Sequence, residues 1–97
     1  MMYFMVEGNL SDPKKITPDL MQEHMAYTQK ALDAGMFLFS GLKETMDGGL
    51  FILKAESQQE VEQYLNNEPF AREEIQSYRV VAFNAHYTNP LAKAWFE

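Results

Sequence analysis

Two histidines are the residues best suited to proton transfer near neutral pH, because an unperturbed imidazole has a pKa of about 6.5. His24 falls within the apolar stripe of a predicted helix, so we expect it to point toward the sheet. Two interpretations of His24 stay open: a core histidine bonded to a backbone or hydroxyl group, or a general acid/base at the bottom of a pocket. His86 lies beyond the last predicted strand, with no metal-like spacing to His24.

A catalytic imidazole usually has an orienting partner. Asp33 lies on the same predicted helix, but at about 100° per residue its side chain points half a turn away from His24. Asp33 is therefore excluded as the partner. The remaining acids include Glu68, which follows the second predicted helix, and Glu7, which ends the first predicted strand. Ser40, near the end of the second predicted strand, is a further polar candidate, and is otherwise an ordinary strand residue.

The composition excludes several kinds of site. The chain has no cysteine, which rules out disulfides, thiolate catalysis and cysteine metal sites. It has no H-x-x-x-H, HExxH, GxGxxG or P-loop motif, so we expect neither a metal nor a cofactor. The net charge is −6 and the basic residues are scattered, which disfavours nucleic-acid binding. No apolar run approaches a membrane span and no export signal is present, so a cytoplasmic location is expected.

The apolar patterns and turn signals predict six main elements. Strands are expected over residues 2–8, 36–42, 50–55 and 78–83. A helix is expected over 18–34, with Thr17 as its cap, and a second from a capping box at Ser57 to about Asn66. A short turn of helix is expected within 70–75. Asp47-Gly48-Gly49 marks a hairpin turn between the middle strands.

The order β-α-β-β-α-β is the ferredoxin-like arrangement, a four-stranded antiparallel sheet with two helices on one face. The strands carry apolar residues on both faces: Phe37 and Phe39 are expected on one side, and Met36, Leu38 and Leu42 on the other. The second face therefore needs a cover, and a second copy of the sheet would supply it. We expect one domain over 1–97 that forms a homodimer, or a higher oligomer, with the 86–97 tail packing at the dimer interface.

The chain also resembles the YciI-like, or YCII-related, family of small dimeric α+β-barrel proteins. The resemblance covers roughly residues 2–85. It is carried by His24 on the first helix, Asp33-Ala34-Gly35, Phe39-Ser40-Gly41, Gly49-Leu50-Phe51-Ile52-Leu53, Ser57 and Glu68-Pro69-Phe70. Glu68 stands where the family has the aspartate of Asp-Pro-Phe, so the acid is one methylene longer here.

The resemblance implies a cofactor-independent enzyme that acts on a small cyclic organic substrate by isomerase-like or lyase-like chemistry. It implies His24 as the general acid/base, Glu68 as its partner, and Ser40, Gly41 and Phe70 as substrate-binding residues. Two alternatives stay open. One is a non-catalytic dimeric module that binds a small ligand or a protein, and the other is a cofactorless monooxygenase of the same barrel class.

Overall fold

The computed structural model describes all 97 residues and has the predicted order of elements. The strands are β1 (Met2–Leu10), β2 (Phe37–Leu42), β3 (Gly49–Ala55) and β4 (Gln76–Phe83). The main helices are α1 (Pro18–Asp33) and α2 (Gln58–Asn66). Short helices follow at α3 (Pro69–Arg72) and α4 (Lys93–Phe96), and a 3-10 turn at Pro13–Lys15 lies in the loop before α1. No helix combines the length and apolar character needed to cross a membrane.

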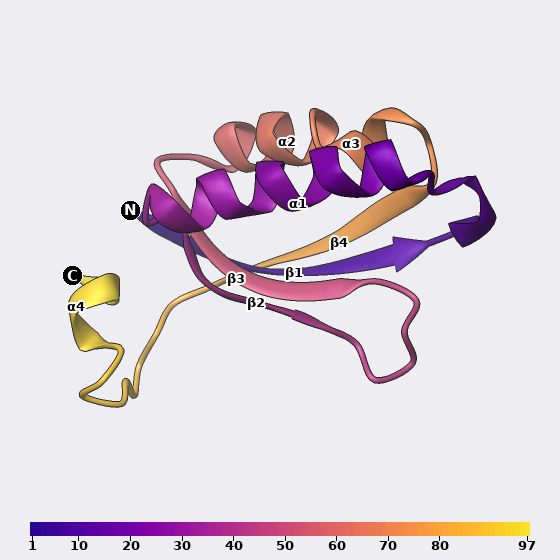
Figure 1. Ribbon diagram of the computed structural model, residues 1–97. Coiled ribbons are helices and arrows are strands. Elements are labelled where there is room, and N and C mark those ends of the chain that lie inside the picture. Colours follow the sequence, from indigo (N-terminus) through magenta and orange to yellow (C-terminus); the bar gives the residue numbers. More distant parts are fainter.

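The strands form one antiparallel sheet in the order β2-β3-β1-β4. Helices α1, α2 and α3 lie together on one face of this sheet (Figure 1). This arrangement confirms the predicted ferredoxin-like α+β fold. Strands β1 and β4 are each two residues longer than predicted, because their far ends pair with each other: Asn9 lies opposite Ser77, and Leu10 opposite Gln76.

The core lies between the sheet and the helices. Alternate residues of β1 and β3 point toward the helices, as the two-residue period of a strand requires. Phe4, Val6, Leu53 and Val61 are completely buried there. Side-chain caps fix where the helices begin: the Thr17 hydroxyl accepts from the Leu20 N–H at 3.1 Å, and the Ser57 hydroxyl accepts from the Glu60 N–H at 3.2 Å. The Glu60 carboxylate accepts from the Glu56 N–H at 3.1 Å, one residue before the position that the predicted capping box requires.

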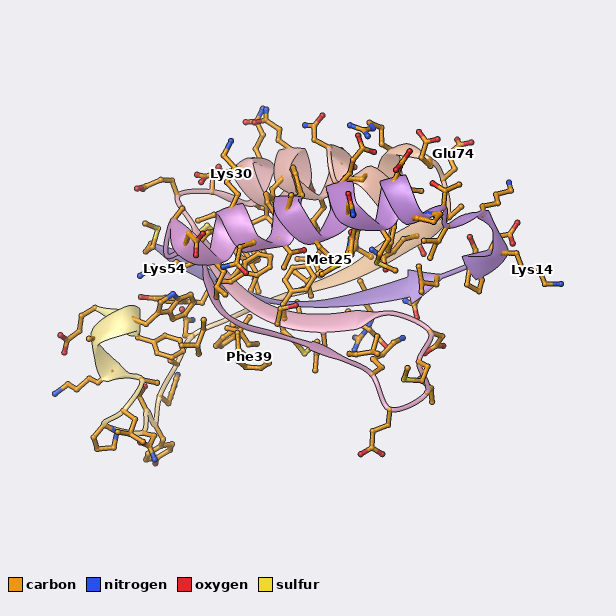
Figure 2. The ribbon with its side chains drawn as sticks, viewed as in Figure 1. Lys14, Met25, Lys30, Phe39, Lys54 and Glu74 are labelled. Atoms are coloured by element: carbon orange, nitrogen blue, oxygen red, sulfur yellow. The ribbon has the colours of Figure 1, made fainter.

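Strand β2 contains an irregularity that corrects one prediction. Phe37 lies opposite Leu53 of β3, but Phe39 lies opposite Ile52, so β2 uses one extra residue at Leu38. Such a bulge reverses the direction of every side chain that follows it. Phe37 therefore faces the helices while Phe39 faces the opposite side, where Figure 2 shows it. The prediction that these two rings share a face is wrong.

The open face of the sheet is apolar at its centre, as predicted. Met5 of β1 and Ile52 of β3 are cross-strand neighbours there, and Phe39 and Val81 are exposed beside them. Glu7 lies on the same face and binds Lys43 Nζ at 3.2 Å and Arg79 Nε at 3.2 Å. No helix of the main layer covers this surface (Figure 1).

The C-terminal segment returns to one end of the open face. Trp95 Nε1 donates to the Gly35 carbonyl oxygen at 2.9 Å, and Lys54 Nζ donates to the Trp95 carbonyl oxygen at 2.6 Å. The Tyr3 hydroxyl donates to the carbonyl oxygen of Phe96. The tail thus packs against its own chain at the end of the sheet, and Figure 1 shows α4 on the side away from α1.

Candidate active site

The two residues that the sequence singled out meet across the fold. His24 lies in the middle of α1, and Glu68 lies at the start of α3. His24 Nδ1 is 2.5 Å from Glu68 Oε1. Glu68 is 3% exposed, whereas the His24 side chain is 28% exposed, so the acid is buried and the imidazole is partly open. A donor at Nδ1 and an acceptor at Oε1 leave Nε2 as the outward-facing nitrogen of the ring.

Each oxygen of Glu68 has its own contacts. Oε1 contacts the imidazole, while Oε2 accepts from the backbone N–H groups of Phe70 at 2.9 Å and Ala71 at 3.3 Å. These two bonds make Glu68 the N-cap of α3. The Tyr78 hydroxyl also donates to Oε2, at 2.9 Å. The carboxylate therefore serves only as an acceptor, and its position is fixed by backbone as well as side-chain donors.

Tyr78 remains a donor over a wide pH range. Burial, and next the charge of Glu68, raise the pKa of Tyr78 well above its ordinary value. The phenol is therefore protonated at neutral pH. Gln76 Nε2 donates to the Tyr78 oxygen at 2.7 Å, which orients the hydroxyl toward Glu68. Tyr78 and Gln76 come from β4, so the sheet supports the acid that the helices bring to His24.

Phe70 forms a platform beneath the imidazole. The two ring centroids are 4.0 Å apart and the planes are only 4° from parallel. Phe70 is 3% exposed, and Pro69 before it presets the first turn of α3. The stacking fixes the plane of the imidazole, while Glu68 fixes its rotation within that plane. Phe70 also lines the cavity described next, but its main contact is His24.

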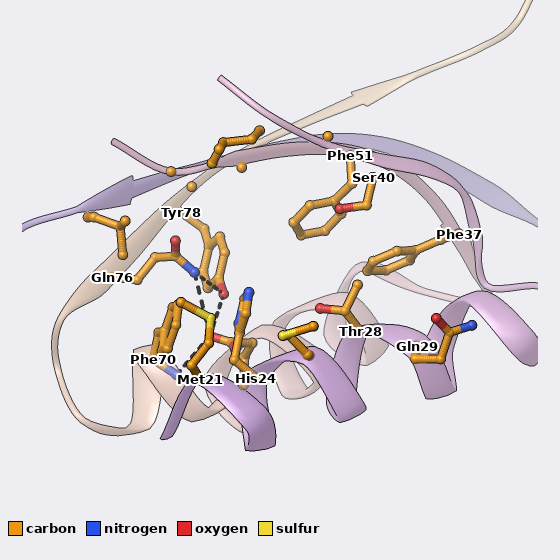
Figure 3. A pocket seen from close by; sticks show the side chains of 18 of the residues that line it. Met21, His24, Thr28, Gln29, Phe37, Ser40, Phe51, Phe70, Gln76 and Tyr78 are labelled. Atoms are coloured by element: carbon orange, nitrogen blue, oxygen red, sulfur yellow. Dashed lines mark hydrogen bonds and ion pairs between the residues drawn. The ribbon is translucent and has the colours of Figure 1, made fainter. Parts of the chain in front are cut away.

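A cavity of about 450 Å³ lies between α1 and the sheet, and His24 points into it (Figure 3). This volume falls within the range of small-molecule sites in proteins. The lining is mostly apolar and aromatic. Its residues include Met21, Met25, Leu32, Phe37, Phe51 and Tyr64. Met25 is 61% exposed, and Met21 and Leu32 are exposed as well, so these three apolar side chains of α1 lie outside the packed core.

Ser40 and Gly41 both line this cavity. The bulge explains the place of Ser40. Because the alternation of side chains in β2 shifts by one residue at Leu38, Ser40 pairs with Phe51 and faces the helices, on the same side as Phe37 (Figure 3). Regular alternation from Phe37 would have placed the Ser40 hydroxyl on the open face.

The other candidates lie elsewhere. Glu7 is on the opposite face of the sheet, where hydrogen bonds from Lys43 and Arg79 lower its pKa. Asp33 accepts from Gln29 Nε2 at 2.8 Å, away from His24, as its place on the helix predicted. His86 is exposed in the tail. No three histidine, aspartate or glutamate side chains gather in a way that could hold a metal ion.

Sequence reasoning did not identify Thr28, Gln76 and Tyr78 as site residues. The position of Thr28 four residues after His24 is a usable signal, because residues one helical turn apart share a face. Tyr78 and Gln76 begin β4, whose pairing with β1 brings them under α3. No local pattern in the sequence indicates that contact.

Comparison with known proteins follows this geometry. A solved structure of 5-chloro-2-hydroxyhydroquinone dehydrochlorinase (TftG) from Burkholderia phenoliruptrix AC1100, in complex with 2,5-dihydroxybenzoquinone, is similar, with a TM-score of 0.67. The two chains are 18% identical, and the match covers 90% of this chain and 96% of that chain. At this identity the likeness shows a shared fold.

No curated protein sequence matches the chain significantly. The family model for the YCII-related domain matches residues 1–84, which span all four strands and the helices α1, α2 and α3. The match confirms the resemblance drawn from the residues. The chain belongs to the YCII-related domain family.

Proposed function

We propose that this protein is a cofactor-independent enzyme that moves a proton on a small cyclic organic substrate. The observation that carries the proposal is the pair His24–Glu68, joined at 2.5 Å, with the imidazole open to a cavity of about 450 Å³. The family relation supports it, since a similar structure is that of a dehydrochlorinase with a small ring compound bound.

The contact with Glu68 selects the form of the imidazole that can act as a base. A carboxylate at Nδ1 favours the tautomer that carries its hydrogen on Nδ1, which leaves the lone pair of Nε2 free. That nitrogen faces the cavity. When Nε2 takes up a proton, the ring becomes positive, and the adjacent Glu68 carboxylate stabilises that charge. Phe70 holds the plane of the ring in place both before and after Nε2 takes up the proton.

The arrangement supports two related reactions. In an elimination, Nε2 takes a proton from a ring carbon, the electrons of that C–H bond form a double bond, and a leaving group departs from the neighbouring carbon with its bonding electrons. In an isomerisation, the same proton returns to a different carbon of the conjugated anion. Both need one base and a water-excluding apolar lining. Ser40 is the group proposed to hydrogen-bond the substrate.

We further propose that the protein works as a homodimer through the open face of the sheet. A centre formed by Met5, Ile52, Phe39 and Val81 is costly to leave in water, and a second copy of the same face would bury it. The C-terminal segment, residues 86–97, packs beside this face through Trp95. We therefore propose that the tail contributes to the dimer interface.

The enzymatic proposal is tested with substitutions of His24. A panel of lactones, enols and halogenated hydroxylated rings is assayed with the native chain and with His24→Ala and His24→Asn. Loss of a general base lowers kcat by about 100-fold or more. A turnover that survives both substitutions contradicts the proposal, and turnover that consumes oxygen in an electrode assay identifies a monooxygenase instead. Binding of ring compounds without any turnover supports a ligand-binding module.

A further inference from the structure

Two polar side chains of the cavity have no hydrogen-bond partner within the chain. Gln76 and Tyr78 bond to each other and to Glu68, and the Gln29 amide bonds to Asp33. By contrast, the hydroxyls of Thr28 and Ser40 make no hydrogen bond within the chain; both residues line the cavity, Thr28 half-buried and Ser40 exposed. A bound molecule thus finds uncharged hydroxyls beside the imidazole.

Thr28 is the nearest of these to the proton-transfer site along the chain. It follows His24 by one turn of α1, so the Cβ atoms of the two residues lie about 5–6 Å apart on one face of the helix. Figure 3 shows the Thr28 side chain pointing into the cavity on the same side as His24, with Ser40 across from it. A planar ring that places a carbon at Nε2 would bring a neighbouring oxygen within reach of Thr28.

The charge of the cavity is equally informative. Its 21 lining residues include no lysine and no arginine. The one fixed charge is Glu68, whose oxygens already contact His24, Phe70, Ala71 and Tyr78. The one group that can become cationic, His24, is already paired with that acid. A substrate carboxylate would therefore enter an apolar space without a counter-charge, which is costly.

We infer that the cavity selects uncharged ring compounds over carboxylated ones, and that Thr28 binds an oxygen of the substrate beside His24. This inference rests on the proposed function and names its substrate class. It makes Thr28 a specificity-determining residue. Phe37 and Phe51, stacked at 4.6 Å between centroids, supply an aromatic wall for the ring.

Two compounds of nearly the same shape test the charge selection. 2,5-Dihydroxybenzamide is neutral, and 2,5-dihydroxybenzoate is an anion at neutral pH. Titration calorimetry with the native chain is expected to show binding of the amide about tenfold or more tighter than binding of the carboxylate. Met25→Lys places an ammonium group at the cavity rim and is expected to reduce this difference about fivefold or more. Gln22→Lys, an exposed site on α1 outside the lining, adds the same charge and serves as the control.

The role of Thr28 is tested with Thr28→Val, which keeps the shape and removes the hydroxyl. The amide is expected to bind this variant about threefold to tenfold more weakly, and Thr28→Ser is expected to restore most of the affinity. Unchanged affinity in Thr28→Val overturns the role of Thr28. Equal affinities of the native chain for the two compounds overturn the charge selection but leave proton transfer by His24 standing. Failure of both compounds to bind overturns the inference and also counts against a ring substrate.

Discussion

The two oxygens of Glu68 have different tasks. Oε1 reaches the imidazole at 2.5 Å, while Oε2 caps α3 and accepts from Tyr78. One side chain thereby contacts both the start of α3 and the histidine. The sequence identified His24 and Glu68 through their types and motif context. It could not supply Tyr78, because that contact depends on strand pairing.

Replacing Glu68 with glutamine separates these tasks. In Glu68→Gln the single amide oxygen can still cap α3, and the uncharged NH2 group then faces His24 in place of the carboxylate oxygen. The imidazole then loses its charge partner and its preferred tautomer, so kcat is expected to fall about 100-fold or more. Circular dichroism should show an unchanged fold, with the melting temperature lowered by a few degrees, as a loss of about 1 kcal/mol predicts. Activity equal to that of the native chain would show that the acid has no role in the chemistry.

The raised pKa of Tyr78 predicts how stability depends on alkaline pH. Burial opposes ionisation of the phenol in the folded chain, so the folded pKa lies above the unfolded value of about 10. The stability that depends on the neutral phenol is present below the unfolded pKa of about 10. It is lost as pH rises from that value through the folded pKa. Denaturant titrations of the native chain and Tyr78→Phe should therefore show a steeper alkaline decline in the native chain. Parallel curves for the two proteins would contradict this account.

Strand β2 shows how an element positions a residue that its sequence pattern would misplace. The run Phe37-Leu38-Phe39-Ser40 contains no glycine or proline at the bulge, so simple alternation gives the wrong faces. Elements with strong local signals, such as α1 with its Thr17 cap, were predicted well. The bulge lies in the pairing of β2 with β3, and the extra length of β1 and β4 comes from the pairing of the first strand with the last; neither leaves a mark in a local window.

The turn between β2 and β3 depends on one glycine. Gly48 has φ +141°, and a Cβ at this position would lie 2.0 Å from the Gly8 carbonyl oxygen. Gly48→Ala is therefore expected to lower the free energy of unfolding by about 2 kcal/mol or more, measured by urea denaturation. Gly41→Ala is the control, because its Cβ would meet nothing closer than 4.0 Å. Equal effects of the two substitutions would show that the close approach to Gly8 does not matter.

Across the whole molecule, the two faces of the sheet have separate roles. One face supports the helices and the cavity, and the other presents an apolar centre flanked by the Glu7, Lys43 and Arg79 ion pairs. The sequence predicted apolar residues on both faces and the need for a cover. That the tail packs at the dimer interface stays a prediction; within this chain the tail contacts Gly35 through Trp95. A single chain of this size buries only about two thirds of its surface, so association with a second copy would add to its stability.

The dimer proposal is tested at the centre of the open face. Ile52→Glu places a charge opposite Met5, where a second sheet would bury it without a partner. Sedimentation of the native chain at micromolar concentration is expected to give a dimer, and the variant a monomer. Asn66→Glu, on the exposed end of α2, introduces the same charge and should leave the dimer intact. A native chain that sediments as a monomer would contradict the proposal.

The bond between His24 and Glu68 joins residues 44 positions apart, and the turn between β2 and β3 lies between them. A cut in that turn would leave the imidazole on an N-terminal fragment and the acid on a C-terminal fragment, each lacking half of the proton-transfer pair. Turnover by a mixture of the two pieces would then depend on their reassociation into the complete sheet. Under the proposed function, turnover by the mixture would report how completely the two fragments have reassembled.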